Sequence, residues 1–322
     1  MSRLNKKIAL VLTLMLALSV ALITSNATST LAAGKTIAVV VHGQAADPFW
    51  SVFKKGVDQA GKDLGVTVTY NAPATFDMPA MAKLIDAAVA AKVDGLVVSI
   101  PDADALGPSI KKAVAAGIPV ISVNSGSDKS QALGTIAHIG QEEYDAGFGA
   151  GQKYADAGVK NALCVIHEQG NAGLEARCQG FSDALKKANA KVANLAVDLK
   201  DPTGVQQKLS AALTADSTID GVLLLGPSVI DPAVKAFGSN LGKIKLATFD
   251  LSPTALDQIA AGNMLFAIDQ QQYTQGYLAI VYMSLYLNNL DTPGSFKVAT
   301  GPGFVTKDNV DKVKALVAAG TR

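Results

Sequence analysis

Two loops of this sequence combine aromatic rings with carboxylate and amide side chains. The first, residues 42–50, contains His42, Asp47, Phe49 and Trp50, the only tryptophan of the chain. The second, residues 167–177, contains His167, Glu168, Asn171, Glu175 and Arg177. Aromatic faces cover the apolar C–H surface of a sugar or polyol, while carboxylates and amides hydrogen-bond its hydroxyls. The loops therefore predict recognition of such a ligand, although Phe49 and Trp50 could instead only pack at the start of a helix.

Signals of catalysis or of cofactor binding are weak. The three histidines do not stand at metal-ligand spacing with other ligands, and neither a GxSxG nor a Walker sequence occurs. The glycines in GFGAG at 147–151 fit a packed helix face better than a dinucleotide loop. Carboxylates such as Asp47, Glu175 and Asp250 could form a glycosidase pair, but no nucleophile or activated water is visible beside them. We therefore expect binding without catalysis, with no cofactor and no metal.

The elements that must position these side chains follow from the periodicity of the chain. From Thr36 onward, short apolar runs alternate with longer Ala-rich segments of helical period, which is typical of a parallel sheet wrapped by helices. Asp47-Pro48, Asp201-Pro202, Asp231-Pro232 and Ser252-Pro253 each suit the first turn of a helix. The expected strands are 36–42, 66–70, 94–100, 118–123, 134–139, 161–166, 192–198, 219–225, 244–249 and 264–269.

An internal repeat relates the two halves of the chain. DGLVVS at 94–99 and IPVISVNS at 118–125 are repeated, 126 positions later, by DGVLLL at 220–225 and IKLATFDLS at 244–252. The shift places Asn124 on Asp250, so each half carries a polar residue just past the carboxyl end of an equivalent strand. Ligands bind outside these ends in open parallel sheets. We expect two α/β lobes whose strand ends face each other, with Asn124 and Asp250 on opposite sides of a cleft.

The first 33 residues predict an exported protein. Arg3, Lys6 and Lys7 precede an apolar run from Ile8 to Ile23, and the segment ends in small and polar residues, as in a cleaved secretory signal peptide. Removing this leader takes away three of the 28 Lys and Arg and none of the 27 Asp and Glu, which leaves a net charge of −2. This charge gives no reason to expect nucleic acid or anionic lipid as a partner.

The chain has only two cysteines, Cys164 and Cys178. In an oxidising compartment they could bridge a strand to the following helix, and the alternative is two small buried thiols. We favour the disulfide.

Several stretches together resemble one protein family. They are TIAVVVHGQAADPFWSVFKKGVDQAGKDLGV, DGLVVSIPDADAL, AAGIPVISVN, EARCQGF, and ATFDLSP followed by FAIDQQQYTQGY. They are similar to the ribose-type periplasmic solute-binding proteins of ABC sugar importers, over residues 35 to 318. The resemblance implies the type I periplasmic binding protein fold, with two Rossmann-like doubly wound parallel-sheet lobes joined by a three-strand hinge.

The resemblance also implies domain boundaries and partners. The first lobe would comprise residues 34–141 and 271–297, and the second 142–270 and 298–322, with chain crossings near Gln141, Gln270 and Lys297. The protein would act in the periplasm as a monomer that closes over one monosaccharide, polyol or cyclitol and delivers it to an ABC permease of the inner membrane. Presentation of the ligand to a chemoreceptor is an alternative role, and an exported sugar-processing enzyme is a less favoured one.

The family's ligand contacts map onto positions of this chain. Asp47 would meet a ligand hydroxyl, Phe49 and Trp50 would supply the aromatic platforms, and Asn124, Asp250 and Gln270 would supply polar contacts. His42 is a further candidate contact on the residue pattern of the first loop, and not on the resemblance.

Three departures from ribose binders affect the expected ligand. Asn124-Ser125 replaces Asp-Arg, Gly226-Pro227 replaces a second-lobe Asn so that this contact is lost or comes from Ser228, and Glu175 stands where an Arg is expected, with Arg177 two residues later. Which of Glu175 and Arg177 makes the second-lobe contact stays open. Fewer guanidinium donors and several carboxylates favour a ligand rich in hydroxyl donors, and a cationic ligand is a further possibility on charge grounds.

Overall fold

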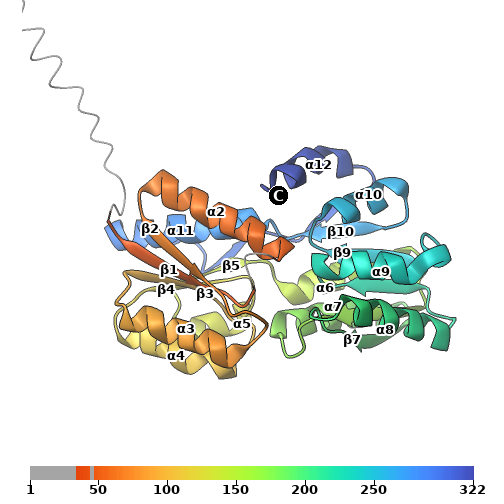
Figure 1. Cartoon of the computed structure of the whole chain (residues 1–322), viewed down its shortest axis with the longest axis horizontal. Helices are drawn as coiled ribbons and strands as arrows, with labels where there is room; N and C mark the ends of the chain where they lie inside the picture. The colour runs from red at the N-terminus through yellow and green to blue at the C-terminus, as the bar shows by residue number, and fades with distance from the viewer. Residues whose placement is uncertain (1–33, 44–46) are drawn as a thin grey trace, which may run out of the picture.

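The computed structural model describes residues 34–43 and 47–322, so the expected leader, residues 1–33, lies outside the described part. Two six-stranded sheets form two lobes that lie end to end (Figure 1). The strands of the first sheet, in spatial order, are β11 (Lys297–Ala299), β5 (Ala137–Gly140), β4 (Val120–Val123), β3 (Gly95–Ser99), β1 (Thr36–Val40) and β2 (Thr67–Asn71). Those of the second are β12 (Gly303–Val305), β10 (Phe266–Asp269), β9 (Lys245–Phe249), β8 (Gly221–Leu224), β6 (Asn161–Ile166) and β7 (Lys191–Ala196).

The predicted two-lobed α/β fold is confirmed, and all ten expected strands are present. Each of the ten has a parallel neighbour as predicted, and among the described strands only the pair β10 and β12 is antiparallel. The sequence did not predict β11 and β12. Each has only three residues, too few for a periodic pattern to show.

Alternation along the first sheet sends side chains to two separate cores. Ile37 and Val39 face the helices α2 (Pro48–Leu64) and α11 (Gln272–Asn289). Ala38 and Val40 face α3 (Met78–Ala90) and α4 (Ala103–Ala115) on the other side. Both faces of the sheet are therefore buried, which explains its nearly continuous apolar strands.

The second sheet is covered in the same way. The helices α6 (Glu143–Asp156) and α7 (Ala172–Lys187) pack on one face. The other face is covered by α8 (Pro202–Ala215), α9 (Ile230–Phe237), α10 (Pro253–Ala261) and α12 (Val310–Ala319). Prolines open α2, α8 and α10 as expected, whereas Asp231-Pro232 lies within the first turn of α9, whose entry is a 3-10 turn at Pro227–Val229.

The glycine-rich run at 147–151 lies inside α6 and packs on α7. A Cβ at Gly147 would collide with the carbonyl of Arg177, and one at Gly151 would lie 2.6 Å from the carbonyl of Phe181. The glycines let the two helices approach closely, as the sequence predicted, and form no dinucleotide loop.

The chain passes between the sheets at three places. It leaves the first sheet after β5, leaves the second after β10, and passes from β11 to β12 at residues 300–302. The third passage was expected near Lys297, but Lys297 begins β11 and pairs with His138 in the first sheet, so the chain crosses after Ala299. The passages after β5 and β10 both begin at the carboxyl end of a parallel strand, so the two sheets are joined at these ends.

The predicted disulfide is present, because Cys164 of β6 is bonded to Cys178 of α7. Among the described residues, no helix is both long and apolar enough to cross a membrane.

Candidate functional site

A pocket lies where strand ends of both sheets meet. The first lobe contributes His42 after β1 and Asn124 and Ser125 after β4, together with residues at the start of α2. The second contributes His167 and Glu168 after β6, residues 225–227 after β8 and Asp250 after β9. The free volume left between these side chains is about 40 Å³, well below the roughly 300 Å³ at which small-molecule sites begin, so a ligand would have to replace contacts that now fill the gap.

A chain of amide and carboxylate groups crosses this pocket from one lobe to the other. Gln270, which follows β10 at the second crossing, donates from Nε2 to Asp250 Oδ1 at 2.9 Å and accepts at Oε1 from Asn124 Nδ2 at 3.2 Å. All three side chains are at most 5% exposed. The two residues related by the repeat thus line the same gap, with Gln270 between them.

The repeat extends to backbone conformation. Asn124 and Asp250 have φ angles of 61° and 65°, in the left-handed region. Asn and Asp tolerate this region better than other non-glycine residues because their short polar side chains can hydrogen-bond locally. The left-handed turn directs each side chain off the end of its strand and into the pocket.

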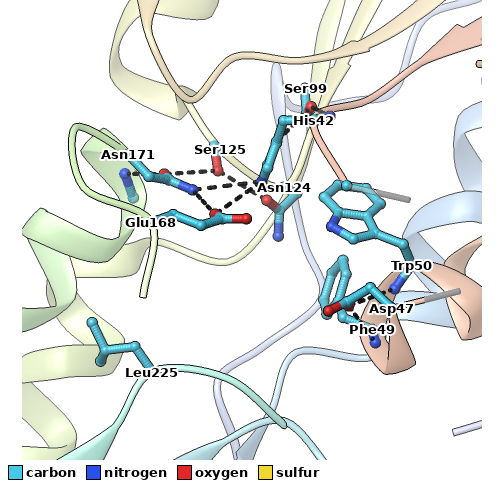
Figure 2. Close-up of polar contacts among 12 residues, drawn as sticks. His42, Asp47, Phe49, Trp50, Ser99, Asn124, Ser125, Glu168, Asn171 and Leu225 are labelled. Atoms are coloured by element: carbon cyan, nitrogen blue, oxygen red, sulfur yellow. Dashed lines mark hydrogen bonds and ion pairs between the residues drawn. The ribbon is translucent and has the colours of Figure 1, made fainter. Parts of the chain in front are cut away.

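Aromatic rings form the first-lobe wall (Figure 2). Trp50 lies edge-on to His42 and to Phe49, with ring centroids 4.8 Å apart in both pairs. Phe49 and Trp50 are also part of the core beneath α2. The two interpretations of these rings are therefore compatible, because the rings pack at the helix start and also line the pocket.

Both carboxylate oxygens of Asp47 are used within the protein. Oδ1 caps α2 by accepting from the backbone N–H groups of Phe49 and Trp50, at 2.9 and 3.4 Å. Oδ2 accepts from Ser228 Oγ of the second lobe at 2.7 Å. Asp47 borders the pocket, but its oxygens join a helix cap to a contact between the lobes rather than pointing unpaired at a ligand.

Arg177 is the second-lobe cation of the pocket. It is 3% exposed, and its guanidinium donates to Glu143 at 2.6 and 2.8 Å and to the carbonyl of Leu225 at 3.0 Å, over the ring of Phe249. Glu175 lies on the exposed side of α7 and does not line the pocket. The expectation that Glu175 reaches the ligand is therefore not supported by the geometry, because Glu175 and Arg177 are two residues apart on α7 and point to different sides of the helix.

A second polar cluster links the lobes at Glu168 (Figure 2). Asn171 Nδ2 donates to Glu168 Oε2 at 2.7 Å, and the same oxygen lies 3.6 Å from His42 Nε2 of the first lobe. The other ring nitrogen of His42 is 2.8 Å from Ser99 Oγ, which also accepts from the His42 backbone N–H. Ser99 therefore fixes the orientation of the ring that meets Glu168.

Burial governs the ionisation of this site. It raises the pKa of Asp250 to about 7 and that of Glu168 to about 7, in each case against the attraction of Arg177. Burial, helped by the positive charge of Arg177, lowers the pKa values of His42 and His167 to about 3. The histidines are therefore neutral at pH 7, whereas the carboxyl groups of Asp250 and Glu168 are each close to half ionised at that pH.

The structure brings together most of the residues that the sequence singled out. His42, Asp47, Phe49, Trp50, Asn124, Arg177, Asp250 and Gln270 line one pocket, and Glu175 does not. Glu168 and Asn171 also line the pocket. The sequence analysis placed them in the second loop but did not name them as ligand contacts. Ser125 and Leu225 also line the pocket but were not expected as contacts. Ser125 had been noted only as a replacement for the Arg of ribose binders, and the only signal of Leu225 was its position beside a strand end. Among the described residues, no group of three or more His, Cys, Asp or Glu could hold a metal ion.

Comparisons with known proteins agree with this geometry. Residues 37–291 match the family described as periplasmic binding protein domain. A solved carbohydrate transporter from Acidothermus cellulolyticus, in complex with myo-inositol, is 39% identical, with a TM-score of 0.85 over 89% of this chain and 99% of that one. A xylose/arabinose-binding protein of Sulfolobus acidocaldarius is 26% identical over 84% of this chain and 71% of the relative. A xylitol-binding protein of Mycolicibacterium smegmatis is 27% identical over 48% of this chain and 43% of its own length.

Proposed function

We propose that this chain, which belongs to the periplasmic binding protein family, captures a polyhydroxylated small molecule between its lobes and delivers it to the permease of an ABC importer. Its relatives are sugar-binding transport proteins, not enzymes. Membership of the family implies an exported protein, and we propose residues 1–33 as the signal peptide that directs the export.

One observation carries this proposal. Polar groups from the strand ends of both sheets converge on one gap, with Gln270 hydrogen-bonded to Asn124 of one lobe and Asp250 of the other. A ligand that replaces these internal hydrogen bonds would contact both lobes at once. Contacts to both lobes exist only when the lobes are together, so such a ligand stabilises the closed form over the open one.

The ligand class follows from the chemistry of the pocket. Asp250 and Glu168 offer carboxylate acceptors for hydroxyl donors, Gln270 and Asn124 can both donate and accept, and Trp50 offers an apolar ring. We rank a cyclitol first, because the 39% identical relative was solved with myo-inositol. Acyclic polyols and pentoses come next, because relatives are named for xylitol, xylose and arabinose.

We propose that closure is a rotation of residues 34–141 with 271–297 against residues 142–270 with 298–322. The sheet membership of β11 supports moving the last boundary to the residues after Ala299. The contacts that join the lobes support this hinge motion. The backbone N–H of Ala172 donates to the carbonyl of Pro101 at 2.9 Å, and Ser228 donates to Asp47.

The test is a thermal-shift panel of myo-inositol, xylitol, pentoses and hexoses on the mature protein, followed by calorimetric titration of each hit. At 100 times its Kd, a true ligand adds about 2.7 kcal/mol of stability, which for a chain of this size raises Tm by several degrees. Asn124→Ala and Asp250→Ala should each weaken binding at least tenfold, about 1.4 kcal/mol. No shift with any compound, or unchanged affinity in both variants, would show that the site is wrongly assigned.

A further inference from the structure

The pocket is lined by more acidic than basic side chains. The charged side chains among its described lining residues are three carboxylates, Asp47, Glu168 and Asp250, and one guanidinium, Arg177. A neutral polyol can hydrogen-bond to carboxylates but cannot balance their charge. Which ligand the pocket prefers therefore depends on which of these charged groups still lack a partner within the protein.

The guanidinium of Arg177 does not balance the lining carboxylates, because Glu143 already pairs with it. Glu143 is outside the pocket lining, and its two oxygens accept from Arg177 Nε at 2.6 Å and from a terminal nitrogen at 2.8 Å. A third guanidinium donor is used by the carbonyl of Leu225. The pair is buried on both sides, with the side chains 4% and 8% exposed.

Among the described residues, no other cationic side chain pairs with the carboxylates of the pocket. His42 and His167 stay neutral at pH 7, because burial and Arg177 lower their pKa values to about 3. Lys200 borders a neighbouring outer cavity that shares Glu168 and His42 with the pocket. Within the described ranges, no ion pair joins Lys200 to Glu168.

The three carboxylates differ in the acceptor capacity that they have left. Both oxygens of Asp47 are engaged, by the helix cap and by Ser228. Both oxygens of Asp250 receive the Gln270 amide, at 2.9 and 3.2 Å. Glu168 accepts through Oε2 only, from Asn171, and none of the described residues hydrogen-bonds to its Oε1.

Glu168 is placed to receive a donor from a ligand. Its side chain is 14% exposed and lies between the two lobes. Figure 2 shows its carboxyl group reaching toward Asn124, with contacts drawn to one oxygen only. Burial raises the pKa of this group to about 7, despite the hydrogen bond from Asn171 and the attraction of Arg177, so its charged form is poorly compensated within the protein.

We propose that the pocket selects a polyhydroxylated ligand that carries a primary ammonium group, such as an amino-substituted cyclitol or an amino sugar, and that Glu168 receives this ammonium. The inference rests on the proposed function, since it concerns the same pocket. Hydrogen bonds between two charged groups are roughly twice as strong as neutral ones. A buried carboxylate is costly without a partner of opposite charge, so the ammonium is preferred over a hydroxyl at this position.

The test compares matched pairs that differ in one group. Myo-inositol is compared with an amino-deoxy-inositol, D-glucose with D-glucosamine, and D-galactose with D-galactosamine, by calorimetric titration at pH 7. In at least one pair the amine should bind tenfold more tightly or better. N-acetylation of that amine removes its charge and should abolish the preference.

The variant Glu168→Gln keeps the shape of the side chain and removes its charge. The preference for the amine should fall below threefold, while affinity for the neutral member of the pair changes less. Asp257→Asn is the matched control, because it removes one negative charge from the exposed surface of the same lobe, where Asp257 is 74% exposed. This control should keep the full preference.

The outcomes separate the two proposals. Binding of myo-inositol or another neutral polyol with no amine preference in any pair would refute the ammonium site and leave the proposed function standing. An amine preference that survives in Glu168→Gln would also refute the role of Glu168. Failure of every compound to bind would overturn the proposed function itself. The wild-type pairs decide the main point even if the variant does not fold.

Discussion

The hydrogen bond from Ser228 to Asp47 joins the lobes outside the inner pocket, and its removal tests the closure mechanism most directly. Ser228 follows β8 in the second lobe, and Asp47 precedes α2 in the first. The contact can exist only when the lobes are together. Ser228→Ala should therefore weaken ligand binding although Ser228 is absent from the inner pocket lining.

The magnitude follows from the geometry. The donor–acceptor distance is 2.7 Å and the acceptor is a carboxylate, and hydrogen bonds to charged groups contribute about 1.5–3 kcal/mol. The pair is only partly buried, so we take the lower limit. A loss of about 1.5 kcal/mol from the closed form corresponds to about a tenfold rise in Kd.

A double-mutant cycle isolates this contact. Asp47→Ser keeps a good N-cap residue for α2 but is too short to reach Ser228. Each single variant should raise the Kd of the best compound in the ligand panel about tenfold, and the double variant should be no weaker than either. Asp77→Ser changes the N-cap of α3 in the same lobe without an interlobe contact and should change the Kd less than twofold. If the losses of the two single variants multiply in the double variant, the contact does not contribute to closure.

Three further predictions concern stability. Arg177→Met leaves Glu143 buried without its partner and should lower the free energy of unfolding by about 3–5 kcal/mol; denaturant unfolding should show that adding Glu143→Leu restores much of the loss. Replacing Cys164 and Cys178 with Ala opens a loop with a sequence separation of 14 and should cost about 3 kcal/mol, and an unchanged Tm would contradict this. The pKa of His42 is lowered to about 3, so its contribution is complete above pH 6.5 and is lost as the pH falls toward 3. Plots of the free energy of unfolding against pH for wild type and His42→Gln should therefore differ in slope by up to about 1.4 kcal/mol per pH unit over this range. Parallel plots would show that His42 does not cause the loss of stability in acid.

The sequence was sufficient for features that depend on local pattern. The apolar runs and their spacing predicted ten strands, because alternation of strand and helix in a doubly wound lobe leaves a regular signal in the chain. The repeat then predicted that Asn124 and Asp250 would line one gap, since equivalent strands of the same polarity end at equivalent edges. Both residues adopt a left-handed φ angle, which fits their residue types.

The orientation of side chains on the helix α7 also follows from the local sequence pattern. Its buried residues include Leu174, Arg177, Cys178 and Phe181, and this helical spacing turns Glu175 outward. The sequence analysis left the choice between Glu175 and Arg177 open, because it compared the two positions only with the pattern of ribose binders. The helical period of residues 172–187 would have separated them, since residues two positions apart lie on different sides of a helix.

Other features depended on contacts between distant segments, which no local pattern contains. Glu143 is 34 residues from Arg177, and Asp47 is 181 residues from Ser228. Whether a carboxylate has a partner is decided by which side chains the fold brings within hydrogen-bond distance. The residue types therefore determined that acids and amides gather at the strand ends. Only the tertiary structure determined that Asp47 and Arg177 are already paired, while Glu168 Oε1 has no hydrogen-bond partner among the described residues.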